Sequence, residues 1–181
     1  MMVLSERDEP MSTTLISLDQ YLHTFWEPDR EFVDGEIVER NLGEKDHAAW
    51  QMALSRLLSN FRQTANIRVY PELRLQTRPT RFRIPDIMAI DRNAPDEQII
   101  THAPLLGVEI LSPEDRINRT EAKVEEYFQM GVRAVWVIDP RTNTAYECGG
   151  SAFAGWKPVQ TLTVPGTPIS LALKDVLADL D

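Results

Sequence analysis

A single glutamate, Glu109, lies within a run of residues that is otherwise apolar enough to form a buried strand, 105–111. An ionised carboxylate in the interior of a sheet carries a large desolvation cost unless a cation or hydrogen-bond donors compensate its charge. We therefore expect a positive group beside Glu109. A divalent metal that Glu109 shares with Asp86, with Lys123 nearby, would meet this need.

Asp86 and Lys123 occupy positions that favour this arrangement. Asp86 follows Pro85 at the beginning of an apolar stretch expected to be a buried strand, and Lys123 lies near the N-terminus of an expected helix. Two carboxylates on adjacent strands can hold Mg²⁺, which prefers oxygen ligands. A lysine beside the metal can stabilise a pentavalent phosphate or lower the pKa of the attacking water. The combination indicates metal-assisted phosphodiester hydrolysis.

Each of these three residues also has a structural interpretation. Asp86 could cap a turn or a strand end. Glu109 could form an ion pair with a neighbouring arginine. Lys123 could extend its apolar stem along the helix and place its charge in water. The sequence leaves these alternatives open.

Apolar periodicity predicts an α/β or α+β fold with a mixed central β-sheet flanked by helices. An apolar strand over 105–111, a helix over 118–130 and a strand over 132–138 favour a right-handed crossover with parallel pairing. The Asp34-Gly35 pair predicts a tight hairpin turn. The other expected elements are helices at 17–26 and 46–63, strands at 30–33, 36–39, 67–70, 73–77, 83–90, 144–148 and 156–162, and an amphipathic segment at 170–180.

Capping patterns and helical spacing predict further details of two helices. In the helix at 17–26, Tyr21 and Phe25 are expected to share one apolar face. Asn118, followed by Glu121, is expected to cap the helix that carries Lys123.

The 181 residues are expected to form one domain over 15–181, preceded by a flexible tail over 1–14. No apolar run approaches the ~20 residues of a membrane-spanning helix. The first residues lack the basic and apolar regions of a signal peptide. A cytoplasmic protein with no membrane partner is therefore expected. The single cysteine, Cys148, cannot form an intrachain disulfide.

The formal net charge of -9 argues against a general nucleic-acid coat protein, which needs a surplus of Lys and Arg. Five arginines nevertheless lie between positions 68 and 83 with a single acid, Glu72. They could be the basic edges of a solvated hairpin or a patch that faces phosphates. These arginines are Arg68, Arg74, Arg78, Arg81 and Arg83.

An ordered set of motifs across the chain resembles the Uma family of restriction endonuclease-like proteins, in the PD-(D/E)XK nuclease superfamily. The resemblance covers about residues 15–175. The resemblance is specific because all these motifs occur in one chain and in the same order. They are the segment 31–36, His47 ahead of a long helix, Pro85-Asp86, the segment 108–113, Lys123 with Tyr127, Gly131-Val132 and the segment 136–140.

This resemblance implies a nuclease core in which Asp86 and Glu109 bind Mg²⁺, or Mn²⁺ in its place, with the carbonyl of Ile110 as a further ligand. The superfamily usually has a lysine two residues after the glutamate, whereas this chain has Leu111. Lys123 then resembles a replacement supplied by the following helix. Glu31 matches an early acidic position that assists the metal in related nucleases.

The resemblance also implies DNA as the partner of a Mg²⁺-dependent endonuclease, and a homodimer that could cut both strands by two-fold symmetry. Residues expected near DNA are Arg81, Arg83, His47 and Tyr127. His47 could instead cap the long helix, and Tyr127 could orient Lys123 or simply pack. The alternative function is a nuclease fold without turnover that binds nucleic acid or protein, as the acidic total charge and Leu111 suggest.

Overall fold

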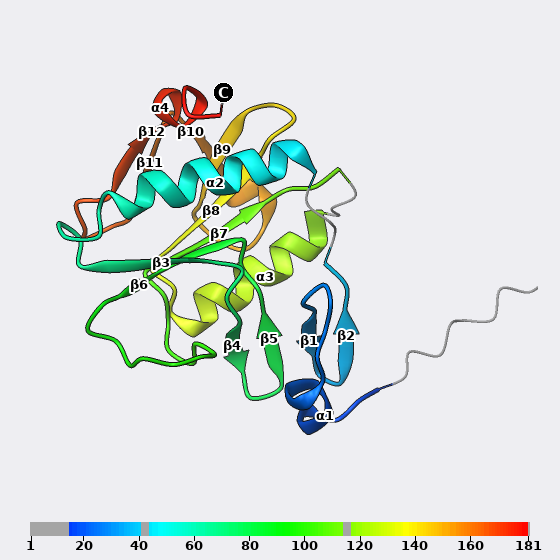
Figure 1. Cartoon of the computed structure of the whole chain (residues 1–181). Coiled ribbons are helices and arrows are strands. Elements are labelled where there is room, and N and C mark those ends of the chain that lie inside the picture. The colour runs from blue at the N-terminus through cyan, green and yellow to red at the C-terminus, as the bar shows by residue number, and fades with distance from the viewer. Residues whose placement is uncertain (1–14, 41–43, 114–116, 181) are drawn as a thin grey trace, which may run out of the picture.

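The computed structural model describes residues 15–40, 44–113 and 117–180, in which two main sheets carry helices on their faces (Figure 1). The expected tail at 1–14 lies outside these residues. The larger sheet has six strands in the order β10-β9-β8-β7-β6-β3. Its strands are β3 (Ile67–Pro71), β6 (Ile87–Asp91), β7 (Leu106–Ile110), β8 (Ala134–Asp139), β9 (Thr144–Cys148) and β10 (Trp156–Val159).

Strand β7 lies in the interior of this sheet, antiparallel to β6 and parallel to β8. Helix α3 (Ile117–Met130) connects β7 to β8, which confirms the predicted crossover with parallel pairing. The fold is therefore a mixed α+β architecture, as the apolar pattern predicts.

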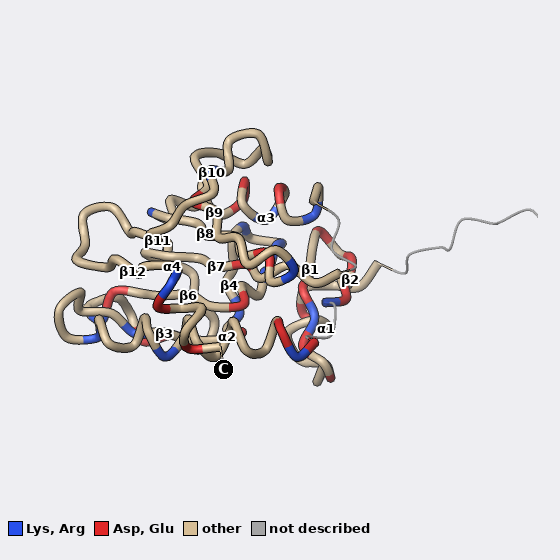
Figure 2. Tube along the Cα trace, turned by 90° about the horizontal axis from the view of Figure 1, so that it is seen from above, with Lys and Arg blue, Asp and Glu red and all other residues tan. Residues whose placement is uncertain are grey.

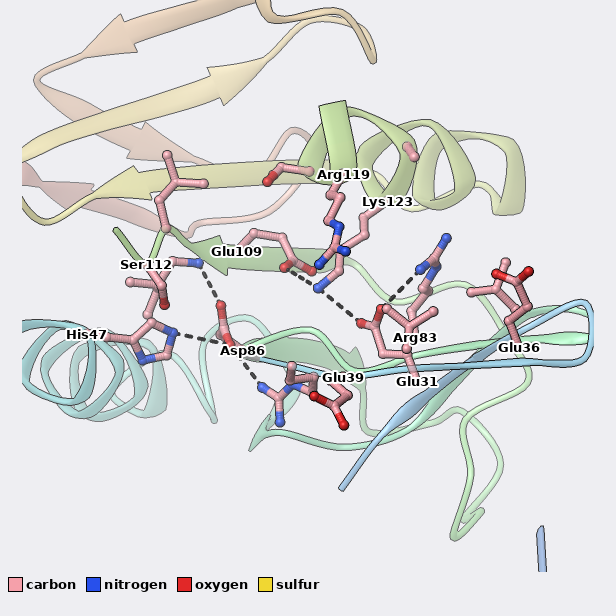
Figure 3. A pocket seen from close by; sticks show the side chains of 17 residues that line it. Glu31, Glu36, Glu39, His47, Arg83, Asp86, Glu109, Ser112, Arg119 and Lys123 are labelled. Carbon is pink, nitrogen blue, oxygen red and sulfur yellow. Dashed lines mark hydrogen bonds and ion pairs between the residues drawn. The ribbon is translucent and has the colours of Figure 1, made fainter. Parts of the chain in front are cut away.

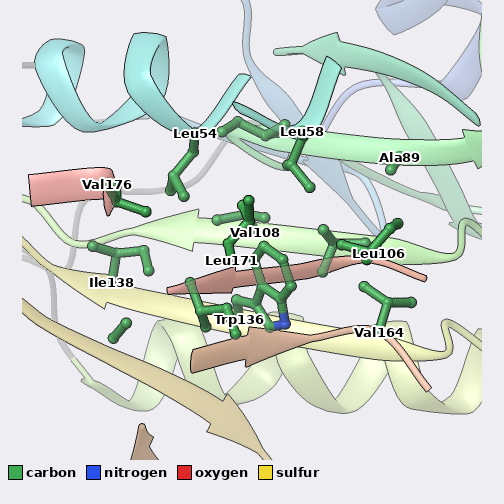
Figure 4. Close-up of a cluster of buried hydrophobic side chains, with 14 of the residues drawn as sticks. Leu54, Leu58, Ala89, Leu106, Val108, Trp136, Ile138, Val164, Leu171 and Val176 are labelled. Carbon is green, nitrogen blue, oxygen red and sulfur yellow. The ribbon is translucent and has the colours of Figure 1, made fainter. Parts of the chain in front are cut away.

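Helix α2 (Lys45–Ser59) covers one face of the larger sheet, where Leu54 and Leu58 pack toward Val108 and Trp136 (Figure 4). Helix α3 contributes Tyr127 to a second apolar cluster. Because side chains alternate along a strand, Val108 points to the first cluster and Glu109 points toward α3. This alternation brings a buried carboxylate next to the helix that carries Lys123.

The smaller sheet has the order β2-β1-β5-β4 and packs its aromatic residues against helix α1 (Leu18–His23). Asp34 and Gly35 have positive φ values of 51° and 100°, which confirms the predicted hairpin turn. A separate hairpin and a short helix complete the chain. The strands are β1 (Glu31–Val33), β2 (Glu36–Val38), β4 (Leu75–Arg78), β5 (Arg81–Arg83), β11 (Thr161–Thr163) and β12 (Ser170–Ala172), and the helix is α4 (Leu173–Leu177).

Two predicted strands are each divided between two sheets. The stretch 83–90 leaves the smaller sheet after Arg83 and enters the larger one at Ile87, because Pro85 has no N–H to donate to a ladder. The stretch 156–162 divides at Gln160 into β10 and β11. The first division places Asp86 on the link between the two main sheets.

Three predictions about helices are wrong. Phe25 is 85% exposed, because α1 ends at His23 and Thr24 is extended. Asn118 lies inside α3 and does not cap it, so Lys123 lies at the seventh residue of the helix, beyond its first turn. The long helix ends at Ser59, and turns fill the rest of the predicted range to residue 63.

Over the described residues, no helix is long and apolar enough to cross a membrane.

Candidate active site

The four residues predicted to carry chemistry meet at a cavity of about 300 Å³ (Figure 3). Glu31 comes from β1 in the smaller sheet, and Asp86 from the link to the larger sheet. Glu109 comes from β7 and Lys123 from α3. The site therefore forms where both main sheets and α3 meet, and it depends on contacts between residues that are far apart in the sequence.

Lys123 bridges two buried carboxylates. Its Nζ lies 2.9 Å from Oε2 of Glu109 and 3.0 Å from Oε1 of Glu31. Burial alone would lower the pKa of Lys123, but the charges of Glu109, Glu31 and Asp86 outweigh burial and raise it. Lys123 is therefore a fixed positive charge at neutral pH.

Glu109 has a raised pKa, whereas the pKa values of Asp86 and Glu31 are lowered. The pKa of Glu109 is raised to about 7, chiefly by burial and also by the charges of Asp86 and Glu31, while Lys123 acts to lower it. The Tyr127 hydroxyl donates a hydrogen bond of 2.5 Å to Oε1 of Glu109. Because one lysine compensates several carboxylates, a further cation near Glu109 would favour its ionised form.

Asp86 is held in its ionised form by donors from three elements. Its Oδ2 accepts a 2.7 Å hydrogen bond from the Ile110 backbone N–H, and its Oδ1 lies 3.1 Å from Nη2 of Arg40 and 3.4 Å from Nε2 of His47. Burial would raise the pKa of Asp86, but His47, Lys123 and the Ile110 N–H hold it below its usual value. Asp86 is therefore a pre-oriented carboxylate at neutral pH.

Glu31 accepts hydrogen bonds from the smaller sheet as well as from Lys123. Nη1 of Arg83 donates to its Oε2 at 3.0 Å, and the Ile84 N–H donates to its Oε1 at 3.1 Å. Burial would raise the pKa of Glu31, but Lys123 and Arg83 overcome this effect and lower it. Glu31 therefore links the lysine of α3 to an arginine of β5.

The oxygen atoms at this site are of the type that Mg²⁺ and Mn²⁺ prefer. Within the described ranges, no three His, Cys, Asp or Glu side chains are grouped closely enough to hold a metal by themselves. Asp86 and Glu109 could hold an ion whose remaining ligands are water and phosphate, as is common for Mg²⁺. The backbone N–H of Ile110 already orients Asp86, and the role of its carbonyl as a ligand stays a prediction.

Two of the four residues predicted to contact DNA are buried. Tyr127 is 0% exposed, and the Arg83 guanidinium is bound by Glu31 and Glu126. Neither offers a free group to DNA in this structure, which disfavours the two predicted contacts. His47 is the third residue of α2 and lies beside Asp86, so it is a site residue and not a helix cap.

The arginines between positions 68 and 83 are occupied by neighbouring groups. Arg74 pairs with Asp29 at 2.7 Å, and Arg81 pairs with Asp34 and Glu126. Along the described part of the chain, acidic and basic residues are interspersed (Figure 2). This favours the structural interpretation of that stretch over a phosphate-binding patch.

Sequence patterns did not indicate Arg40 and Arg119, which line the cavity, or Glu126, which lies outside it. Arg40 follows β2 and reaches Asp86 from the smaller sheet, and no local pattern indicates this contact. Arg119 and Glu126 lie four residues before and three residues after Lys123, so helical spacing places them on its face of α3. That spacing is the signal that could have found them.

Arg119 differs from the other basic residues of the cavity. Arg40, His47, Arg83 and Lys123 all lie within ion-pair distance of carboxylates. Arg119 lines the same cavity, is exposed, and forms no hydrogen bond or ion pair with any residue that the structure describes.

Replacing Glu109 by Gln should change how stability depends on pH. The folded-state pKa of about 7 exceeds the ordinary value of 4.5, so folded wild type binds more protons between these values and loses stability as pH rises through them. The slope is at most about 1.4 kcal/mol per pH unit. Glu109→Gln lacks this loss, so its free energy of unfolding relative to wild type should rise from pH 5 to pH 7. Urea unfolding in EDTA measures this difference, and parallel pH profiles would contradict it.

Comparison with known proteins shows a shared fold and a family. A crystal structure described as "a putative nuclease belonging to DUF820 from Anabaena variabilis ATCC 29413" is 23% identical and superposes with a TM-score of 0.78. The match covers 92% of this chain and 99% of that chain, so the two share a fold.

The family model "Uma2: Putative restriction endonuclease" matches residues 18–179, and this chain belongs to that family. A cryo-EM structure of a DrdV-DNA complex is 15% identical, with a TM-score of 0.41 over 76% of this chain and 11% of that chain. This similarity is too low to define a shared fold. None of the curated proteins compared with the chain matched it.

Proposed function

We propose that this protein is a metal-dependent endonuclease that hydrolyses phosphodiester bonds of DNA. The observation that carries the proposal is the position of the Lys123 ammonium, between Glu109 and Glu31 and at the same cavity as Asp86. A lysine that is ion-paired with carboxylates from β1 and β7 is suited to a reaction in which negative charge develops on a phosphate.

Asp86 and Glu109 would hold Mg²⁺ or Mn²⁺, with the Ile110 carbonyl as a further ligand. When bound, the ion would lower the pKa of a coordinated water and offset charge on the phosphate. Because its pKa is raised, Lys123 supports the developing negative charge and does not act as a base. Glu31 orients Lys123, while Arg40 and His47 keep the Asp86 carboxylate ionised and in place.

Arg119 is the residue we assign to a DNA phosphate, because it is the exposed cavity-lining arginine without a partner in the described part of the chain. Arg119→Ala should weaken DNA binding to a similar degree for all sequences and lower the slope of log K against log[salt] by about 0.9. Measurements of DNA affinity at salt concentrations of about 50 to 200 mM give this slope. Arg141→Ala, on the loop after β8, is the control.

The proposal predicts that purified protein cleaves plasmid and linear DNA when Mg²⁺ or Mn²⁺ is added, and that EDTA stops cleavage. A homodimer could cut both strands of a duplex through its two-fold symmetry. Sedimentation of the protein with and without DNA measures its oligomeric state. An absence of cleavage with either metal, at concentrations where DNA is bound, would overturn the enzymatic proposal.

A binding module without turnover is the second candidate function. It is favoured by the net charge of -9 and by Leu111 in place of the usual lysine. The site carboxylates, Glu31, Asp86 and Glu109, also already have positive partners within the protein. These partners are Lys123, Arg83, Arg40 and His47. Tight DNA binding without metal uptake would support it. If the cluster is only an ion-paired core, Glu109→Gln leaves metal affinity unchanged and alters stability alone.

A further inference from the structure

We propose that Glu126 is a positioning residue, which fixes the Lys123 ammonium by acting through Arg83 and Glu31. This inference rests on the proposed function where it concerns turnover, but its geometric part does not. Glu126 lies on α3 and is 3% exposed, although it does not line the cavity. A buried carboxylate away from the reacting groups needs either a structural or a functional explanation.

Glu126 accepts four hydrogen bonds, which account for both of its oxygens. Nε and Nη2 of Arg83 donate at 3.0 and 2.7 Å. Nη1 of Arg81 donates at 2.9 Å, and Oγ1 of Thr77 donates at 2.7 Å. Burial would raise the pKa of Glu126, but Arg83, Thr77 and Arg81 lower it, so the carboxylate is charged.

The two bonds from Arg83 fix the direction of its third nitrogen. A guanidinium is planar and its donors have a fixed fork geometry, so a carboxylate that binds Nε and Nη2 leaves Nη1 to face the other way. In this structure Nη1 lies 3.0 Å from Oε2 of Glu31. Glu126 therefore determines which single donor Arg83 offers to Glu31.

Glu31 has a second oxygen, and this oxygen binds Lys123. Because Arg83 occupies only Oε2, Oε1 stays available to the lysine ammonium and to the Ile84 N–H. If Arg83 were free to rotate, it could bind both oxygens of Glu31 and compete with Lys123. The orientation of Arg83 thus protects the contact that holds the lysine.

These contacts join four residues of alternating charge, Lys123, Glu31, Arg83 and Glu126, into a ring that the backbone of α3 closes. The ring begins and ends on α3, since Glu126 lies three residues after Lys123 and so on the same side of the helix. It passes through β1 and β5 of the smaller sheet. The ring therefore fixes the smaller sheet to α3 at the point where Lys123 meets Glu109.

Glu126→Gln keeps the shape of the side chain, removes the charge and turns one acceptor into a donor that faces Arg83. We expect kcat for DNA cleavage to fall about 10–100-fold, as is typical when a residue that orients a metal-site ligand is changed. KM for DNA should stay within about twofold, because Glu126 is buried and outside the cavity.

The geometric part is tested by NMR of the lysine side-chain ammonium groups. The chain has four lysines, and Lys45, Lys157 and Lys174 are exposed. Lys123, held by two carboxylates, should give the one slowly exchanging ammonium signal in wild type. Glu126→Gln should abolish or broaden this signal. Arg81→Gln is the matched control, because Arg81 also binds Glu126 but lies outside the ring, and it should retain the signal.

The outcomes separate this inference from the proposed nuclease activity. A wild-type protein that shows the signal but does not cut DNA would contradict the activity alone. A folded Glu126→Gln variant that retains the wild-type signal would overturn the positioning role. If Glu126→Gln does not fold, Arg83→Lys replaces it, because a lysine cannot bind Glu126 and Glu31 with a fork. A folded Arg83→Lys with an unchanged Lys123 signal would overturn the inference equally.

Discussion

Lys123→Met should abolish DNA cleavage and also destabilise the fold. Removal of a pre-oriented charge beside a developing oxyanion lowers kcat by about 10²–10³-fold. The variant also leaves Glu31 and Glu109 in the interior without their shared cation, and breaking a buried ion pair costs about 3–5 kcal/mol. Protonation of Glu109, whose pKa is already raised to about 7, should make the loss of stability smaller at pH 5 than at pH 8.

Single-turnover cleavage and urea unfolding at both pH values measure these effects. Lys157→Met is the control, because Lys157 is an exposed lysine on β10, and it should leave kcat and stability near those of wild type. Wild-type turnover in a folded Lys123→Met variant would show that Lys123 has no part in the chemistry.

Asp86→Asn should abolish cleavage with a smaller effect on folding. The amide oxygen of asparagine can still accept the hydrogen bond from the Ile110 N–H, but the side chain no longer carries the charge that Arg40 and His47 face. A bound metal contributes several kcal/mol of transition-state stabilisation, and about 1.4 kcal/mol corresponds to a tenfold change in rate. We therefore expect kcat to fall at least about 100-fold and the affinity for Mn²⁺ to fall with it.

Calorimetric titration with Mn²⁺ and cleavage assays measure the two effects on the same preparation. Glu72→Gln is the matched control, because Glu72 also pairs with Arg40, yet its side chain is 52% exposed and does not line the cavity. This control should bind Mn²⁺ and cut DNA as wild type does. Equal Mn²⁺ affinity in wild type and Asp86→Asn would remove Asp86 from the metal site.

Local sequence patterns were sufficient for the elements whose structure depends on nearby residues. The Asp34-Gly35 turn needs positive φ values that these residues tolerate, and the apolar stripe of α2 follows from helical periodicity. Apolar strands on both sides of α3 predicted the parallel pairing. The division at Pro85 was missed, because Ile84 before it and Ile87 after it are both apolar and buried, although β5 and β6 belong to different sheets.

Local sequence patterns also predicted only part of the candidate site. A carboxylate within an apolar strand indicated Glu109, and its alternation along β7 gave the correct side of the sheet. The contacts of Arg40 with Asp86 and of Arg83 with Glu126 join residues 46 and 43 positions apart. The first pair depends on how the segment after β2 meets the link before β6, and the second on how the smaller sheet packs on α3. No local spacing contains that information.

Tyr127 lies on the helix face that its spacing predicts, and its burial favours the packing alternative over a contact with DNA. Helical spacing placed it on the face of Lys123, but whether it reaches DNA or the interior depends on the depth of α3 on the sheet. In the structure it is fully buried and donates its hydroxyl hydrogen to Glu109. Burial and the charge of Glu109 raise the pKa of Tyr127 well above its ordinary value, so it stays a donor at neutral pH.

The central claim is that the cluster of Asp86, Glu109 and Lys123 cuts DNA with a metal. The most direct test is a single-turnover cleavage assay with Mg²⁺ or Mn²⁺ that compares wild type with Asp86→Asn and Lys123→Met under identical conditions. We predict that wild type cleaves, that EDTA stops it, and that both variants remain folded but lose cleavage. Cleavage by either folded variant at the wild-type rate would contradict the claim.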